Sequence, residues 1–159
     1  MRAILIAVAV LWPMLAWAQT NIAFGSNEAN QDAPVEVTAD SLSVDQQSGT
    51  AIFTGNVVIG QGTLRLAAPK VLVVYREASQ EISRLEATGG VTLVDGDDAA
   101  EAQNATYNLD GRTIVMTGNV LLTQGPTAIT ADRMVVNLDS NTAQMTGRVK
   151  TVLQQGSGN

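Results

Sequence analysis

The chain has 159 residues, with 15 acidic and 9 basic side chains, a formal net charge of −6 at pH 7, and neither cysteine nor histidine. An acidic balance without a basic stripe excludes sequence-independent nucleic-acid binding. The lack of histidine and cysteine removes the usual metal ligands and the usual general base, so we predict no metal site, no cofactor and no catalytic residues.

Residues 1–18 have the form of a secretory signal peptide. Arg2 precedes an apolar stretch, and the small residues Ala16 and Ala18 form a cleavage-site pattern. The apolar stretch is short for a bilayer, which favours cleavage over the alternative, an uncleaved membrane anchor. We predict an exported protein cut after Ala18. Its stability must come from packing and strand pairing, because it has no disulfides.

The next segment, residues 19–34, is polar and lacks periodicity, so we predict a flexible leader. From Val35 onward the apolar residues alternate with polar ones, and Val, Ile and Thr are frequent. Period two predicts strands with one buried face, and no window has helical spacing. We therefore expect an all-β, antiparallel domain over residues 35–153 with almost no helix, followed by a disordered tail at residues 154–159.

One pattern of the form apolar, Thr, Gly, variable, Val occurs four times in this domain. The glycines of the copies are 34, 29 and 29 residues apart, and they are Gly55, Gly89, Gly118 and Gly147. Regular self-similarity predicts one structural unit used four times. We interpret each unit as a bent hairpin.

Each of these glycines interrupts a strand whose alternation continues on both sides. An interior glycine weakens a strand and marks a bend or a close approach. We therefore place Gly55 within a bent strand and not at a hairpin tip, with Thr54 and Asn56 facing water. Four bends in register would curve the sheet towards a barrel or jelly roll with an apolar inside.

A second pattern begins at an alanine in the first half of each unit. The step from this alanine to the next inward residue is three, which reverses the face of a strand unless the chain bulges. We predict bulges or bends at the residues that follow the alanines, namely Asp40, Pro69, Gln103 and Asp132.

Together, these repeats resemble the OstA-like domain of the lipopolysaccharide-transport proteins over almost all of the chain after the signal. The resemblance implies a slightly open, twisted β-jelly roll in the periplasm, whose apolar interior holds the acyl chains of lipopolysaccharide. It also implies a non-enzymatic bridge that carries this lipid from the inner to the outer membrane. Departures from the pattern are Pro69 and Gln103 in place of Asp, and Gly90 and Arg148 in place of Asn.

The resemblance also implies partners and site residues. The partners are lipopolysaccharide through its lipid A acyl chains, an inner-membrane anchored OstA-like protein, an outer-membrane barrel translocon, and further copies of the chain stacked head to tail. The lipid-facing interior residues would be Phe53, Val57, Ile59, Leu93, Met116, Val120, Leu122, Met145 and Val149. The assembly edges would be formed by Val35, Val37 and Ala39 at one end and by Val149, Thr151 and Leu153 at the other.

Each of these interpretations has a plainer alternative. The inward row could be dry core, as in small barrels and in a structural repeat scaffold or adhesin, although flexible Met side chains and an uncovered apolar face favour a ligand. The ends could be edges protected by the charges of Arg148 and Lys150. Asp95–Asp98 is predicted to be a solvated turn and not a calcium loop. Asp40 and Asp132 are predicted to accept backbone hydrogen bonds at bends.

Overall fold

A computed structural model describes residues 21–25 and 32–154; the predicted signal peptide lies outside the described residues, as does the tail after residue 154. The described residues form eleven strands, and none of their segments is a helix that could cross a membrane. In chain order the strands are β1 (Asn21–Ala23), β2 (Glu36–Thr38), β3 (Ser41–Asp45), β4 (Thr50–Gln61), β5 (Leu64–Tyr75), β6 (Ile82–Asp95), β7 (Asp98–Asn108), β8 (Thr113–Gln124), β9 (Thr127–Asn137), β10 (Thr142–Thr146) and β11 (Lys150–Leu153).

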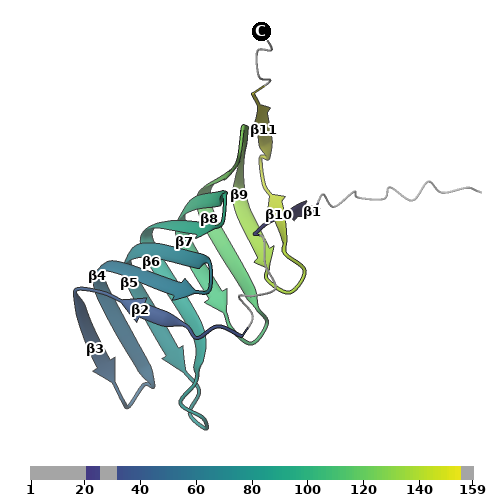
Figure 1. The fold of residues 1–159 in the computed structure, drawn as a ribbon. Coiled ribbons are helices and arrows are strands. Elements are labelled where there is room, and N and C mark those ends of the chain that lie inside the picture. Colours follow the sequence, from purple (N-terminus) through teal and green to yellow (C-terminus); the bar gives the residue numbers. More distant parts are fainter. Residues whose placement is uncertain (1–20, 26–31, 155–159) are drawn as a thin grey trace, which may run out of the picture.

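The strands form one antiparallel sheet that follows the order of the chain, except at β1. From β4 to β10, consecutive strands pair with one another. Strands β2 and β3 both pair with β4, and β11 pairs with β9 and not with β10. Strand β1 pairs with β10, at the opposite end of the molecule from β2 and β3 (Figure 1). The two end strands do not pair with each other, so the sheet stays open, and the expectation of an all-β antiparallel fold is confirmed.

The repeated glycine motif forms a bulge in the middle of β4, β6 and β8. In β4, Gly55 and Asn56 lie opposite the single residue Pro69 of β5, and their φ angles are 83° and 46°. Two residues against one is the definition of a β-bulge, and it bends the strand. The same arrangement sets Gly89 and Gly90 against Gln103, and Gly118 and Asn119 against Asp132. The predicted bends at Pro69, Gln103 and Asp132 are therefore confirmed, and at Asp40 the chain breaks between β2 and β3.

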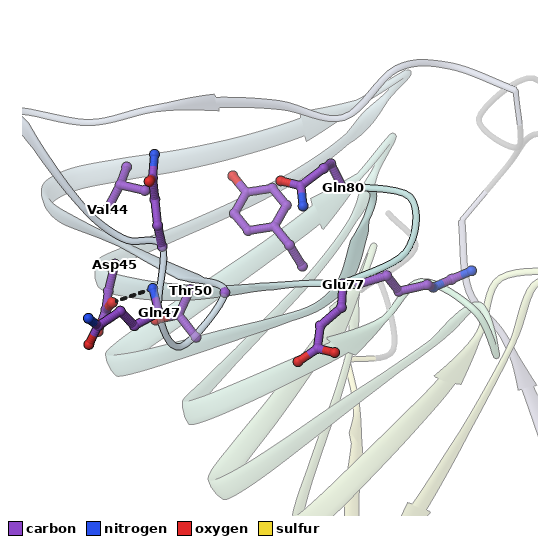
Figure 2. A pocket seen from close by; sticks show the side chains of 10 residues that line it. Val44, Asp45, Gln47, Thr50, Glu77 and Gln80 are labelled. Atoms are coloured by element: carbon purple, nitrogen blue, oxygen red, sulfur yellow. Dashed lines mark hydrogen bonds between the residues drawn. The ribbon is translucent and has the colours of Figure 1, made fainter.

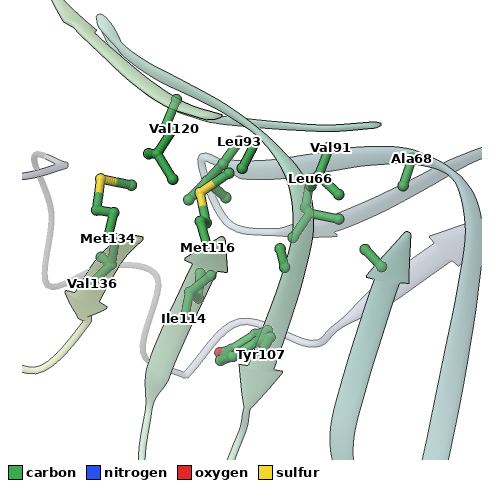
Figure 3. Close-up of a cluster of buried hydrophobic side chains, with 14 of the residues drawn as sticks. Leu66, Ala68, Val91, Leu93, Tyr107, Ile114, Met116, Val120, Met134 and Val136 are labelled. Atoms are coloured by element: carbon green, nitrogen blue, oxygen red, sulfur yellow. The ribbon is translucent and has the colours of Figure 1, made fainter. Parts of the chain in front are cut away.

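The aligned bulges form a corner along which the sheet folds into two layers. Each long strand contributes one half to each layer. We call "layer one" the layer that contains β3 and β10, and "layer two" the layer that contains β2 and β11. In Figure 3, Leu93 and Val120 of layer two point towards Met116 and Met134 of layer one. Strand β8 supplies side chains to both layers, because Met116 precedes its bulge and Val120 follows it.

The core lies between the layers and consists mainly of aliphatic side chains from alternate positions of the long strands, together with Phe24 and Tyr107. Its largest fully buried side chains, each less than 2% exposed, are Phe24, Leu85, Leu93, Ile114, Met116, Leu122, Met134, Val57, Val71, Val73, Val91 and Val120. One face of each long strand, β4 to β9, is thus buried, as the period-two pattern predicts.

Candidate functional site

The motif glycines lie at the corner because the facing strand comes very close to them. A Cβ on Gly118 would lie 2.6 Å from Oε1 and 2.8 Å from Cβ of Gln103, and the φ angle of Gly118 is 84°. A Cβ on Gly147 would meet Asp132 in the same way, at 2.6 Å from Oδ2. Positive φ and close approach both favour glycine, so the corner itself requires this residue.

The aspartates of the first-half pattern close the corner through side-chain hydrogen bonds. Asn56 Nδ2 donates to Asp40 Oδ2 over 3.0 Å, and Arg148 donates from Nε (3.2 Å) and Nη2 (2.9 Å) to the two carboxylate oxygens of Asp132. The bond to Asp132 raises the pKa of Arg148. The donors are therefore side chains and not the backbone amides that we expected. Both aspartates belong to a structural contact that joins the two halves of a unit.

The structure buries most of the side chains that were predicted to face the interior. Those that are at most 9% exposed are Val57, Ile59, Leu93, Met116, Val120, Leu122 and Met145. Phe53 is half-buried and packs against the core. The prediction for Val149 is wrong: it is 51% exposed, because it precedes the last strand, β11, whose four residues are all exposed.

A few polar side chains join the layers at the rim opposite the corner. Tyr107 in layer one donates its hydroxyl hydrogen to Gln61 Oε1 in layer two over 2.7 Å, and this bond is buried. Gln61 Nε2 donates to the carbonyl oxygen of Ala33 over 3.1 Å. In layer two, Thr63 Oγ1 donates to Asp95 Oδ1 over 2.6 Å. The rim is thus polar, whereas the space between the layers is lined by apolar side chains.

Burial raises the pKa of the Tyr107 hydroxyl above its ordinary value of 10.0, with a smaller raising effect from Asp139 and a lowering one from Arg112. The folded chain therefore holds this proton more tightly than the unfolded chain does. The stability that it contributes is complete below the unfolded-state pKa and is lost as pH rises through the folded-state pKa.

Replacing Tyr107 with Phe tests this bridge. Gln61 Oε1 then loses a buried donor, and the free energy of unfolding at neutral pH should fall by about 1–3 kcal/mol. In urea titrations from pH 7 to pH 11, the wild-type chain should lose its advantage over Tyr107→Phe above a pH of about 10. If the difference in free energy of unfolding between the two chains stayed constant across that range, the Tyr107 hydroxyl would not have a raised pKa in the folded chain.

The two open ends of the sheet expose apolar side chains. Leu42 and Val44 of β3 are 54% and 60% exposed, and they pair with Phe53 and Ala51, so they lie on the inner face. Of the predicted edge residues, Val35, Val37 and Ala39 lie in and beside β2 and are half-buried, whereas Val149, Thr151 and Leu153 are exposed. The predicted edge residues did not include those of β3 (Ser41–Asp45), which is the end strand of layer one.

A surface hollow of about 580 Å³ lies beside β3, between the β3–β4 turn and the β5–β6 loop (Figure 2). Its walls combine the apolar Val44 and Tyr75 with polar and charged side chains such as Gln47 and Gln80. Hydrogen bonds from Ser48 and from the Gln47 amide lower the pKa of Asp45 at its edge. The hollow therefore offers a mixed polar surface and not a dry slot for an alkyl chain.

The leader contributes a strand that sequence reasoning missed. Residues 21–23 form β1 on the free edge of β10, Phe24 is 1% exposed within the core, and its amide donates to the carbonyl oxygen of Asn141 over 2.8 Å. The Gly25 amide donates to Asp98 Oδ2 over 3.0 Å. The prediction of a flexible leader is therefore wrong at residues 21–25. The apolar spacing of Ile22 and Phe24 was the available signal.

Comparisons with known proteins point to one family. Residues 36–157 match the family model described as "LptA/(LptD N-terminal domain) LPS transport protein". An uncharacterized protein of Rhizobium meliloti (strain 1021) is 31% identical over 96 residues, which is 56% of this chain and 52% of that protein. The lipopolysaccharide export system protein LptA of Escherichia coli (strain K12) is 43% identical over 42 residues, which is 26% of this chain and 23% of that protein.

The fold is also similar to that of a solved structure. The crystal structure of LptH, described as the LptA homologous periplasmic component of the lipopolysaccharide transport device of Pseudomonas aeruginosa, superimposes with a TM-score of 0.71. It is 16% identical, and the match covers 80% of this chain and 99% of that one. The chain spans about half the length of the Rhizobium relative and about a quarter of the length of the Escherichia coli one.

Proposed function

This chain belongs to the LptA/LptD N-terminal domain family of lipopolysaccharide transport proteins, and we propose that it holds the acyl chains of lipopolysaccharide between its two layers. One observation carries this proposal: the sheet is folded over an aliphatic interior but does not close. The chain would carry lipid from the inner to the outer membrane without chemistry of its own. Movement would be driven by another component.

Lipid would enter by separation of the two layers about the corner. The corner glycines have positive φ and already form the bend. At the opposite rim, the Tyr107–Gln61 hydrogen bond joins side chains of the two layers. The segment of β1 adds hydrogen bonds to layer two, from the Gly25 amide to Asp98 and from Gln124 to the carbonyl oxygen of Ala23. Side chains such as Met116 and Met134 are flexible and can adapt to an alkyl chain. Opening therefore exchanges aliphatic contacts for similar contacts with lipid.

Photocrosslinking tests the proposed interior. A photoreactive amino acid at Val57, Met116 or Val120 should capture lipopolysaccharide in living cells, because these side chains face the space between the layers. The matched control is Val58, which is adjacent in β4 but points outwards and is 38% exposed. No capture from any of the three inward positions, or equal capture from Val58, would refute an interior lipid site.

The alternative is a structural repeat scaffold with a dry core. The observation in its favour is that the inward side chains are already buried against one another, with Leu93, Met116 and Leu122 all 0% exposed. A filled interior is normal for small barrels. Under this alternative the crosslinking variants would capture no lipid although the chain is folded and exported.

We further propose a location and partners. The protein would work in the periplasm after export and cleavage after Ala18. It would assemble end to end with further copies of itself, with an inner-membrane anchored protein of the same fold and with an outer-membrane barrel translocon. The open strand edges at both ends support this proposal, because unpaired backbone groups can add a strand from a partner. The exposed apolar residues of β3 and β11 give such contacts area to bury.

A further inference from the structure

Strand β1 occupies the edge at which a second copy would continue the sheet. It pairs with β10 in antiparallel register, with Ile22 opposite Ala143 and Ala23 opposite Thr142. Without β1, β10 would be the last strand of layer one at this end of the sheet (Figure 1). The free chain thus covers with its own residues an edge that end-to-end assembly requires.

The direction of β1 matches that of β3. From β3 through β10, each strand is antiparallel to its neighbour. Strand β3 is therefore parallel to β5, β7 and β9 and antiparallel to β4, β6 and β8. This alternation makes β3 antiparallel to β10, as β1 is. A second copy that extended the sheet by translation would therefore bring its β3 onto β10 in the direction that β1 already has.

The two strands also have the same pattern of side chains. Asn21-Ile22-Ala23-Phe24 and Ser41-Leu42-Ser43-Val44 both read polar, large apolar, small, large apolar. Val44 is paired with the buried Ala51, and Ile22 with the buried Ala143, so in both strands the large side chains are on the inner face. At its own end of the sheet β3 leaves these side chains more than half exposed, whereas Phe24 of β1 is 1% exposed.

Charge also favours β3 of a second copy as the occupant. The end that contains β2 and β3 has the acidic residues Glu36, Asp40 and Asp45. At the end that contains β10 and β11, Arg148 is paired with Asp132, and Lys150 adds a positive charge. Opposite charges at the two ends of one chain favour head-to-tail contact and disfavour contact between like ends.

We propose that β1 is an intramolecular competitor of β3, and that copies of the chain join by exchange of β1 for β3 of the next copy on the β10 edge. This inference rests on the end-to-end assembly in the proposed function and adds its regulation. Because β1 belongs to the same chain as β10, its effective concentration is on the order of millimolar. Dilute chains are therefore capped monomers. At high local concentration, β3 of a second copy displaces β1 from β10. Strand β3 is the longer of the two, since it forms five ladder pairs with β4, whereas β1 forms three with β10.

A disulfide that locks β1 tests the exchange. The Phe24 amide bonds to Asn141, so the neighbouring pair Ala23 and Thr142 is of the non-hydrogen-bonded type, with Cα atoms about 4.5 Å apart, within disulfide range. The natural chain has no cysteine, so Ala23→Cys with Thr142→Cys forms a defined bridge. In sedimentation across a concentration series, the oxidised variant should remain monomeric where its reduced form and the wild-type chain assemble.

Two further variants address the competing strands separately. Phe24→Ser weakens the cap and should lower the concentration of half-assembly about tenfold or more, because the tethered competitor is lost. Leu42→Asp, at an exposed position, should prevent assembly while the Phe24 amide keeps its hydrogen-exchange protection in the monomer.

The outcomes separate the two levels of the proposal. Equal assembly by the oxidised and reduced forms would overturn the competition between β1 and β3 and leave end-to-end assembly intact. If the wild-type, reduced and Phe24→Ser chains all stay monomeric at every concentration, end-to-end assembly is refuted, and the competition with it. Crosslinking of lipid in the interior is independent of both results.

Discussion

Gly118→Ala should lower the free energy of unfolding by about 2–5 kcal/mol, the sum of left-handed backbone strain and steric overlap. The φ angle of Gly118 is 84°, and the added Cβ would lie 2.8 Å from Cβ of Gln103. The overlap cannot be relieved by rotating the Gln103 side chain, because its Cβ is attached to the backbone of β7. Relief requires the two strands to move apart at the corner, so the loss should be visible in urea unfolding.

Gly125→Ala is the matched control. Gly125 also has positive φ, 54°, but a Cβ there would meet no atom within 4 Å. Only the backbone strain applies, and the expected loss is about 1–2 kcal/mol. Equal losses for the two variants would show that close approach at the corner does not explain the repeated glycine.

The corner could be predicted because its two halves leave signals in the sequence. Alternation that continues through Gly118 excludes a turn, and the odd step after Ala102 or Ala131 predicts a bulge or bend at the residue that follows. The pairing of these signals across a hairpin could not be predicted. That Gln103 and Asp132 face the motif glycines depends on register, and register is set by contacts between strands that are distant in sequence.

The end strands could not be predicted from the same patterns. A three-residue strand such as β1 is too short for period two to be distinguished from chance, and its partner β10 begins more than a hundred residues later. Val149 occupies the final position of the fourth motif copy, so the resemblance implies an interior position for it. Alternation marks a face of a strand, however, and burial also requires a neighbouring strand, which Val149 lacks at the end of the sheet.

Whether the interior is a lipid site or a dry core determines what a cavity in it would do. Met116 is 0% exposed between the layers, and Met116→Ala should lower the free energy of unfolding by about 2–5 kcal/mol. In a dry core, lipopolysaccharide would not restore any of this lost stability. In a lipid site the wild-type side chains must first separate from one another to admit an alkyl chain, whereas the variant has already lost part of that packing.

Lipopolysaccharide should therefore raise the melting temperature of Met116→Ala more than that of the wild-type chain, because a ligand that binds the folded state stabilises it in proportion to RT ln(1 + [L]/Kd). Val58→Ala, on the outer face, should change neither the stability nor the response to lipid by a comparable amount. If lipopolysaccharide stabilises Met116→Ala no more than the wild-type chain, the cavity is not in the path of the lipid. The aliphatic interior would then serve the fold alone.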